Sequence, residues 1–199
     1  MSPLIIIPPA KKPRPKGMRF LDIGFGKAER IASYARRPRS KNRFFMGIEA
    51  KKRKGVRVPS RQHNVKLVIG DAVKRMKRLK PKSFNVINID FVPFLRKEAV
   101  GVTGLQTRIE ARYVEAMPGL LKEARRVLPE GGRFYITVPF SDALETKVMM
   151  EKAGFKQTRA DEVPESKMNT TDEMRKHFEY AETDITAMPW RVVGIKRSN

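Results

Sequence analysis

Residues 18–26 read Met-Arg-Phe-Leu-Asp-Ile-Gly-Phe-Gly, an apolar run that ends in two glycines one residue apart. The run predicts a buried strand over residues 18–23, and the glycines predict a tight turn directly after it. Because glycine has no Cβ, Gly24 and Gly26 let the backbone turn sharply and approach a ligand closely. A plain strand-to-turn junction explains the same two glycines, so they do not by themselves establish a binding site.

Beyond this stretch, apolar runs alternate with helical patterns. We expect further strands at 43–49, 65–69, 84–90, 133–138, 155–158 and 190–196. Helical spacing predicts helices at 28–35, 72–79, 105–128, 144–152 and, within an acidic segment, 172–180. Pro118 is expected to kink or divide the third of these helices. The alternation predicts an α/β fold, a Rossmann-like doubly wound sheet, in which ligands bind beyond the carboxyl ends of the strands.

The composition bounds both the organisation and the chemistry of the chain. Its 199 residues suit one domain at 18–199 behind a basic, Pro-rich leader at 1–17. The absence of cysteine excludes disulfides and thiolate chemistry. With only two histidines, His63 and His177, we expect no metal site. No apolar run is long enough to cross a bilayer, so we expect a soluble cytoplasmic protein without a membrane partner.

The positive charge is concentrated in one part of the chain. The formal net charge is +22, and residues 36–82 hold 18 Lys or Arg against two acids. The positive electrostatic field of such a surface favours a polyanionic partner, and nucleic acid is the first candidate. A solvated surface or heat adaptation is the alternative, but heat adaptation usually adds acids together with bases. We assign the nucleic-acid contacts to the basic clusters, Arg36, Arg37, Lys51, Lys52, Arg53, Lys54, Lys74 and Arg75.

The two acids in this basic part both stand at the ends of predicted strands. Glu49 ends the second strand, a little over 20 residues after Asp22, where a carboxylate suits a ribose diol. Asp71 ends the third strand, where it suits an adenine amino group. A helix N-cap or an ion pair is the alternative for each acid, and Asp71 before Ala72 has the position of an N-cap. A dinucleotide fingerprint is absent, because Glu29 occupies the place of its third small residue. The phosphate-binding motif Gly-x-x-x-x-Gly-Lys-Ser/Thr does not occur either.

Four motifs together resemble a known family. They are Asp-x-Gly-x-Gly at 22–26, Gly-Ile-Glu at 47–49, Gly-Asp-Ala at 70–72 and Leu-Pro-Glu-Gly-Gly-Arg-Phe at 128–134. The chain is similar in them to the class I S-adenosylmethionine-dependent methyltransferases, from about residue 18 onward, although Ala28 replaces the usual third glycine. The resemblance implies a sheet of about seven strands, mostly parallel, with an antiparallel last strand. It also implies S-adenosylmethionine as cofactor, with Asp22, Gly24 and Gly26 around its methionine part, Glu49 at the ribose, and Asp71 and Ala72 at the adenine.

The segment after the fourth strand, where the substrate is expected, reads Asn-Ile-Asp-Phe-Val-Pro-Phe at 88–94. It lacks the Asn/Asp-Pro-Pro-aromatic motif of amino-directed nucleic-acid methyltransferases. It is faintly similar to the Phe-Pro-Asp-Pro-Trp motif of the tRNA guanine-7 methyltransferases, through Phe91, Pro93 and Phe94, with one residue missing. Asn88 and Asp90 are the candidate catalytic residues, with a structural ion pair as the alternative for Asp90. Phe91, Phe94 and Tyr34 are candidates for stacking on a base, although aromatics that end a strand more often belong to a core.

These observations predict a methyltransferase acting on RNA, most readily tRNA, by direct in-line transfer to a base. Two alternatives stay open. One is an RNA-binding protein that keeps the methyltransferase fold without catalysis. The other is a small-molecule methyl or aminopropyl transferase, which the strong positive charge disfavours for a cationic substrate.

Overall fold

The computed structural model describes residues 17–24, 29–37, 42–50, 64–89, 104–162 and 189–197. Within them the strands are β1 Arg19–Ile23, β2 Phe44–Glu49, β3 Val65–Ile69, β4 Val86–Ile89, β5 Arg133–Pro139, β6 Phe155–Glu162 and β7 Pro189–Lys196. The helices are α1 Glu29–Arg36, α2 Ala72–Lys77, α3 Gly104–Val127 and α4 Phe140–Lys152. The predicted leader at 1–17, apart from Gly17, and the predicted helix at 172–180 lie outside the described residues.

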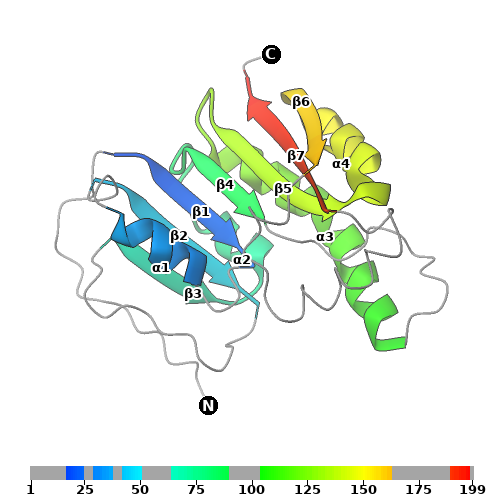
Figure 1. Cartoon of the computed structure of the whole chain (residues 1–199), viewed down its shortest axis with the longest axis horizontal. Helices are drawn as coiled ribbons and strands as arrows, with labels where there is room; N and C mark the ends of the chain where they lie inside the picture. The colour runs from blue at the N-terminus through cyan, green and yellow to red at the C-terminus, as the bar shows by residue number, and fades with distance from the viewer. Residues whose placement is uncertain are drawn as a thin grey trace.

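The seven strands form one sheet in the order β3-β2-β1-β4-β5-β7-β6 (Figure 1). Neighbours from β3 to β5 are parallel, while β7 is antiparallel to both β5 and β6. The chain builds outward from β1 to β3 and then crosses back to β4, so the strand order reverses between β1 and β4. The predicted Rossmann-like α/β sheet with an antiparallel last strand is confirmed, and the reversal marks the edge where ligands bind in such sheets.

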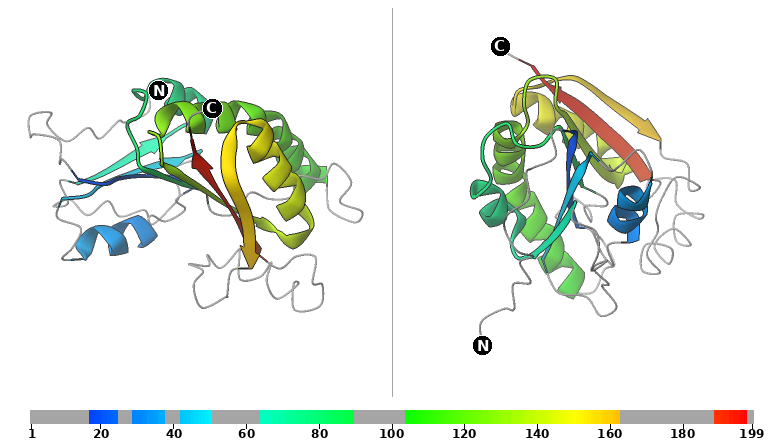
Figure 2. Two further views of the ribbon diagram at one scale, coloured as in Figure 1. Left: turned by 90° about the horizontal axis from the view of Figure 1, so that it is seen from above. Right: turned by 90° about the vertical axis from the view of Figure 1, so that its left-hand side faces the viewer.

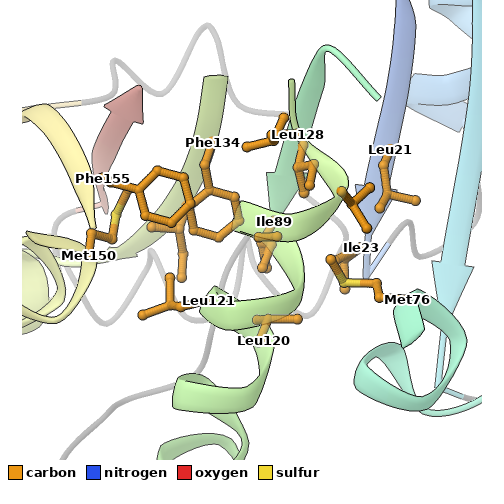
Figure 3. Packing of buried hydrophobic residues seen from close by; sticks show 14 of the residues in the cluster. Leu21, Ile23, Met76, Ile89, Leu120, Leu121, Leu128, Phe134, Met150 and Phe155 are labelled. Carbon is orange, nitrogen blue, oxygen red and sulfur yellow. The ribbon is translucent and has the colours of Figure 1, made fainter. Parts of the chain in front are cut away.

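Helices cover both faces of the sheet. α1 lies on one face, and α2, α3 and α4 lie on the other (Figure 2). On the α1 side, Ile31 packs with Phe45 and Val65 of the underlying strands. On the other side, one larger core joins α3 and α4 to the strands, with Leu121, Phe134, Met150 and Phe155 at its centre (Figure 3).

Pro118 does not divide the long helix, because α3 runs without interruption from Gly104 to Val127. The side chain of Pro118 is exposed, while Met117, Leu120 and Leu121 beside it are buried against the sheet. A proline within a helix costs about 3 kcal/mol. Burial of several large apolar side chains contributes about 1.5–3 kcal/mol each and offsets that cost. The prediction that Pro118 divides the helix was therefore wrong, because burial of the apolar residues beside and after it offsets the cost of the proline.

Arg126 connects α3 to the short helix α2. Its guanidinium donates to the carbonyl oxygens of Met76 at 2.7 Å and Leu79 at 2.8 Å, at the C-terminal end of α2. Its Nε also donates to a carboxylate oxygen of Glu123 at 2.7 Å. The last carbonyls of a helix have no partner within it, and this one side chain binds two carbonyls at and just after the end of α2 and so ties α2 to α3.

Candidate functional site

The carboxyl ends of the parallel strands bring the predicted cofactor residues to one edge of the sheet. Ile23 pairs with Ile48 across β1 and β2, and Glu49 pairs with Ile69 across β2 and β3. Asp22, Glu49 and Asp71 therefore stand at or just beyond the ends of three adjacent strands. This is the carboxyl edge of the sheet, and the strand order reverses directly beside Asp22, between β1 and β4.

Asp22 and Asn88 are joined across β1 and β4. The two residues are register partners in these parallel strands, and Asn88 Nδ2 donates to Asp22 Oδ1 at 3.1 Å. Asp22 is only 7% exposed, whereas Asn88 is half-buried. The structure thus places a predicted cofactor residue and a predicted catalytic residue in direct contact. The sequence did not reveal this contact, since it depends on the pairing of strands 66 residues apart.

Glu49 provides a buried carboxylate at the end of β2. Its side chain is 7% exposed, and its Oε1 accepts from the backbone N–H of Ala50 at 3.0 Å. That hydrogen bond fixes the direction of a buried carboxylate at the strand end. A carboxylate has about four lone-pair sites in all and can accept further hydrogen bonds from a ligand diol.

Gly24 makes the turn that leaves β1. Its φ is +75°, a conformation that favours glycine, and its N–H donates to the carbonyl of Ile48 at 2.8 Å. The turn therefore stays anchored to β2 while it changes the direction of the chain. Gly26 lies outside the described residues.

Asp71 is the N-cap of α2. Its Oδ1 accepts from the backbone N–H of Lys74 at 2.7 Å, and its carbonyl accepts from the N–H of Arg75 at 2.9 Å. The helix-cap alternative for Asp71 is thus confirmed. The cap uses one oxygen of an exposed carboxylate, so it is compatible with a second role beside a ligand. Ala72 follows as the first residue of α2 and packs against the main core.

The cap gives Asp71 a measurable effect on stability. Replacing Asp71 with Ala should lower the free energy of unfolding by about 1 kcal/mol, because one backbone N–H of α2 loses its partner. Replacing it with Asn should cost only a few tenths, since Asn caps about as well as Asp. Chemical denaturation of both variants tests this, and equal losses for Ala and Asn would show that the cap is not what the side chain contributes.

The predicted RNA-contact residues fall in different places. Because α1 connects the end of β1 to the start of β2, Arg36 and Arg37 at its end lie toward the opposite, amino edge of the sheet. There the Arg37 guanidinium lies over the ring of Tyr34 at 4.6 Å, and Tyr34 is 43% exposed. Tyr34 is therefore not a core residue, and this cation–π pair is open to solvent.

Lys74 and Arg75 lie in the first turn of α2, beside the carboxyl edge. Lys74 is exposed. Arg75 turns back onto β3, where its Nη2 donates to the carbonyl of Ile69 at 2.6 Å and its guanidinium occupies the space above Gly70. The other basic candidates, Lys51, Lys52, Arg53 and Lys54, lie outside the described residues. So does the substrate segment after Ile89, with Asp90, Phe91 and Phe94.

Two negative findings apply to the described part of the chain. No group of three or more His, Asp or Glu side chains there has the arrangement of a metal site. Among the same residues, no helix combines the length and the apolar character needed to cross a membrane.

No protein-family model matches this chain, and no curated protein is similar enough in sequence to count as a relative. Solved structures do match. The structure of the 16S rRNA methyltransferase KamB superposes with a TM-score of 0.64 at 13% identity, over 92% of this chain and 90% of that one. The fold is that of the class I methyltransferases.

Two further solved structures show how widely this methyltransferase fold is used. The phosphoethanolamine N-methyltransferase 2 of Haemonchus contortus, solved with S-adenosyl-L-methionine, superposes with a TM-score of 0.62 at 13% identity. The alignment covers 94% of this chain, which spans about half of that protein. The [4+2]-cyclase SpnF superposes with a TM-score of 0.60 at 15% identity, over 92% of this chain and 76% of its own. At these identities the likeness shows the fold, and the activity has to be argued from the site.

Proposed function

We propose that this protein is an S-adenosylmethionine-dependent methyltransferase that transfers a methyl group directly to a base of RNA, with tRNA as the leading substrate. The observation that carries the proposal is the placement of Asp22, Glu49 and Asp71 at the carboxyl ends of three adjacent parallel strands. The solved methyltransferases that share the fold, one of them with S-adenosylmethionine, support the same cofactor.

The side chains at this edge fit such a cofactor. Glu49 is a buried acceptor suited to the two ribose hydroxyls, and Asp71 with Ala72 would hold the adenine. Asp22, Gly24 and Gly26 would surround the methionine part, where a glycine turn permits close approach. When bound, S-adenosylmethionine supplies a methyl group already activated by its sulfonium, so the chain's own task is to bind and orient.

Asn88 and Asp90 are the residues we assign to the target base. Asn88 is held by Asp22, so its amide is fixed beside the proposed cofactor site. Orientation of two reactants supplies much of the rate of such a displacement. A ring nitrogen with a lone pair needs no proton acceptor, whereas an amino or hydroxyl target would need one, a role open to Asp90. The assignment of guanine N7 as the target atom is based only on the motif similarity at residues 91–94, and the solved structures compared above do not favour it.

The RNA substrate is supported by charge. The chain carries +22, and 18 of its 43 cations fall within residues 36–82, which include the strands β2 and β3. If about six phosphates are neutralised, the logarithm of RNA affinity should fall with the logarithm of salt concentration at a slope of about −5. A substrate of this class also accords with our expectation of a cytoplasmic protein.

Transfer of a labelled methyl group from S-adenosylmethionine into total RNA tests the proposal. We expect label in RNA that depends on the protein, falls steeply with salt and is lost in an Asp22→Ala variant. A folded protein that binds RNA but transfers no label to it would contradict the proposal. It would favour the alternative of an RNA-binding protein with this fold and no catalysis, which the incomplete motif at 88–94 suggests.

A small-molecule transferase is the second alternative, and the phosphoethanolamine methyltransferase with the same fold favours it. Salt-independent transfer to a small acceptor, with no label in RNA, would identify it.

A further inference from the structure

A groove lies between α3 and α4, far along both helices from their N-terminal ends. It has a volume of about 560 Å³ and is lined by nine residues, none of them acidic. Five of the nine are cations, Lys122, Arg125, Arg126, Lys152 and Lys196, and the other four are apolar. We call it the α3–α4 groove.

Two of the five cations of the groove, Lys122 and Lys152, remain available to a ligand. Arg126 is engaged by Glu123, and Lys196 lies 3.8 Å from a carboxylate oxygen of Glu130. Lys122 and Lys152 are exposed, and neither has an ion pair among the described residues. The groove therefore attracts anions more strongly than a surface on which lysines alternate with acids.

Helix ends explain only part of this pattern. Cations are favoured in the last turn of a helix by its dipole, which accounts for Arg125, Arg126 and Lys152. Lys122 lies before the last turn of α3, so the dipole does not account for it. A second hollow follows at the amino edge of the sheet, where the exposed cations Arg133 and Arg197 lie near Lys196 and Glu130. The positive surface thus continues beyond the groove.

The groove lies toward the amino edge, opposite the proposed cofactor site. Both helices end there, α3 just before the start of β5 and α4 just before the start of β6. The seven residues of β5 span about 23 Å between the two edges. A ligand that reaches both places must be longer than a nucleotide or a small metabolite.

We propose that the α3–α4 groove is a second RNA-binding surface, which holds the sugar–phosphate backbone of a folded RNA whose target base enters the carboxyl edge. This rests on the function proposed above and narrows its substrate to a folded RNA. The two exposed lysines, Lys122 and Lys152, can each pair with a phosphate, and the apolar lining can contact sugars and exposed base faces. RNA is favoured over an acidic protein because the exposed Lys74, Lys77 and Arg78, in and directly after α2, lie on the same face of the sheet as the groove (Figure 2). One long polyanion can engage both sets of cations.

Variants on α4 and α3 separate the groove from the overall charge. Lys152 lines the groove and Lys147, on the same helix, does not, so Lys152→Gln and Lys147→Gln form a matched pair. Adding Lys122→Gln to Lys152→Gln gives the full groove variant. We expect it to bind total tRNA about tenfold more weakly, with a salt slope less steep by about 1.5–2, since two phosphate contacts are lost.

Three controls accompany this measurement. Lys147→Gln should bind tRNA like the unmodified chain. A short oligouridine, too short to reach both edges, should bind the unmodified chain more weakly than tRNA does. Binding of S-adenosylhomocysteine should be unchanged in every variant, which also verifies that each is folded.

Two results would overturn the proposal for the groove, and only the second of them would also overturn the proposed RNA substrate. If the unmodified chain binds tRNA and methylates it, but the groove variant does so equally well, only the groove proposal fails and an acidic protein becomes the better occupant. If the unmodified chain binds no RNA, the proposed RNA substrate fails with it.

Discussion

Replacing Glu49 with Ala should weaken the binding of S-adenosylhomocysteine by about 10- to 100-fold. A hydrogen bond to a charged group contributes about 1.5–3 kcal/mol, and each 1.4 kcal/mol is a factor of ten in affinity. Glu49 is 7% exposed and fixed by the N–H of Ala50, so its carboxylate is in place before a ligand arrives. Isothermal titration calorimetry of the purified variant measures the loss.

Two further variants make this result specific. Glu145 is an exposed acid on α4, which packs on β5, β6 and β7 and not on the strands that carry Asp22, Glu49 and Asp71. Glu145→Ala therefore changes the charge equally and should leave the affinity unchanged. Glu49→Gln keeps the size of the side chain and should lose an intermediate amount, because an amide still accepts one hydrogen bond. Retained affinity in a folded Glu49→Ala variant would show that the ribose lies elsewhere.

Replacing Phe134 with Ala should lower the free energy of unfolding by about 3–5 kcal/mol. Phe134 is fully buried in β5, and its ring stacks on Phe155 of β6 with centroids 5.4 Å apart (Figure 3). The change leaves a cavity in the main core beneath α3 and α4. A whole domain is stable by only about 5–15 kcal/mol, so this single change removes a large share.

Urea denaturation with matched variants tests the core. Phe134→Leu leaves a smaller cavity and should cost about 1–2 kcal/mol, and it keeps the measurement possible if the Ala variant does not fold. Leu144 is 71% exposed on α4, so Leu144→Ala should change stability by less than about 0.5 kcal/mol. Equal effects at Phe134 and Leu144 would mean that Phe134 does not lie in a packed core.

Local pattern was enough to locate most elements of the fold. The strand predicted at 65–69 has those bounds, and the strands at 43–49 and 133–138 differ by one residue at an end. The last edge strand was predicted too short, at 155–158, and extends to Glu162. Its residues are mostly polar and exposed, and an irregularity lies between Lys156 and Arg159, where Gln157 has a φ of 50°. This strand forms because it pairs with β7, and its sequence has no alternation of apolar residues from which its length could be predicted.

The parts of the site that lie at the end of a single strand could be predicted from the sequence. The contacts that depend on how neighbouring strands pair could not. Asp22, Glu49 and Asp71 each follow an apolar run, so their common edge follows from a parallel sheet. The Asn88–Asp22 hydrogen bond and the Arg75 contact with Ile69 require the register and the side-chain direction. The α3–α4 groove is lined by cations that lie between residues 122 and 196. They are far apart in the sequence, so the sequence alone does not predict that they lie together.

The measurement that tests the central claim most directly is a calorimetric titration of the full chain with S-adenosylhomocysteine, the product left after methyl transfer. We expect one site per chain with a dissociation constant on the order of micromolar, about −8 kcal/mol. The same titration with adenosine alone should show much weaker binding, since the contacts around Asp22 and Gly24 are lost. A folded protein that binds neither compound would contradict the account, and the basic surface would then have to carry the function without this cofactor.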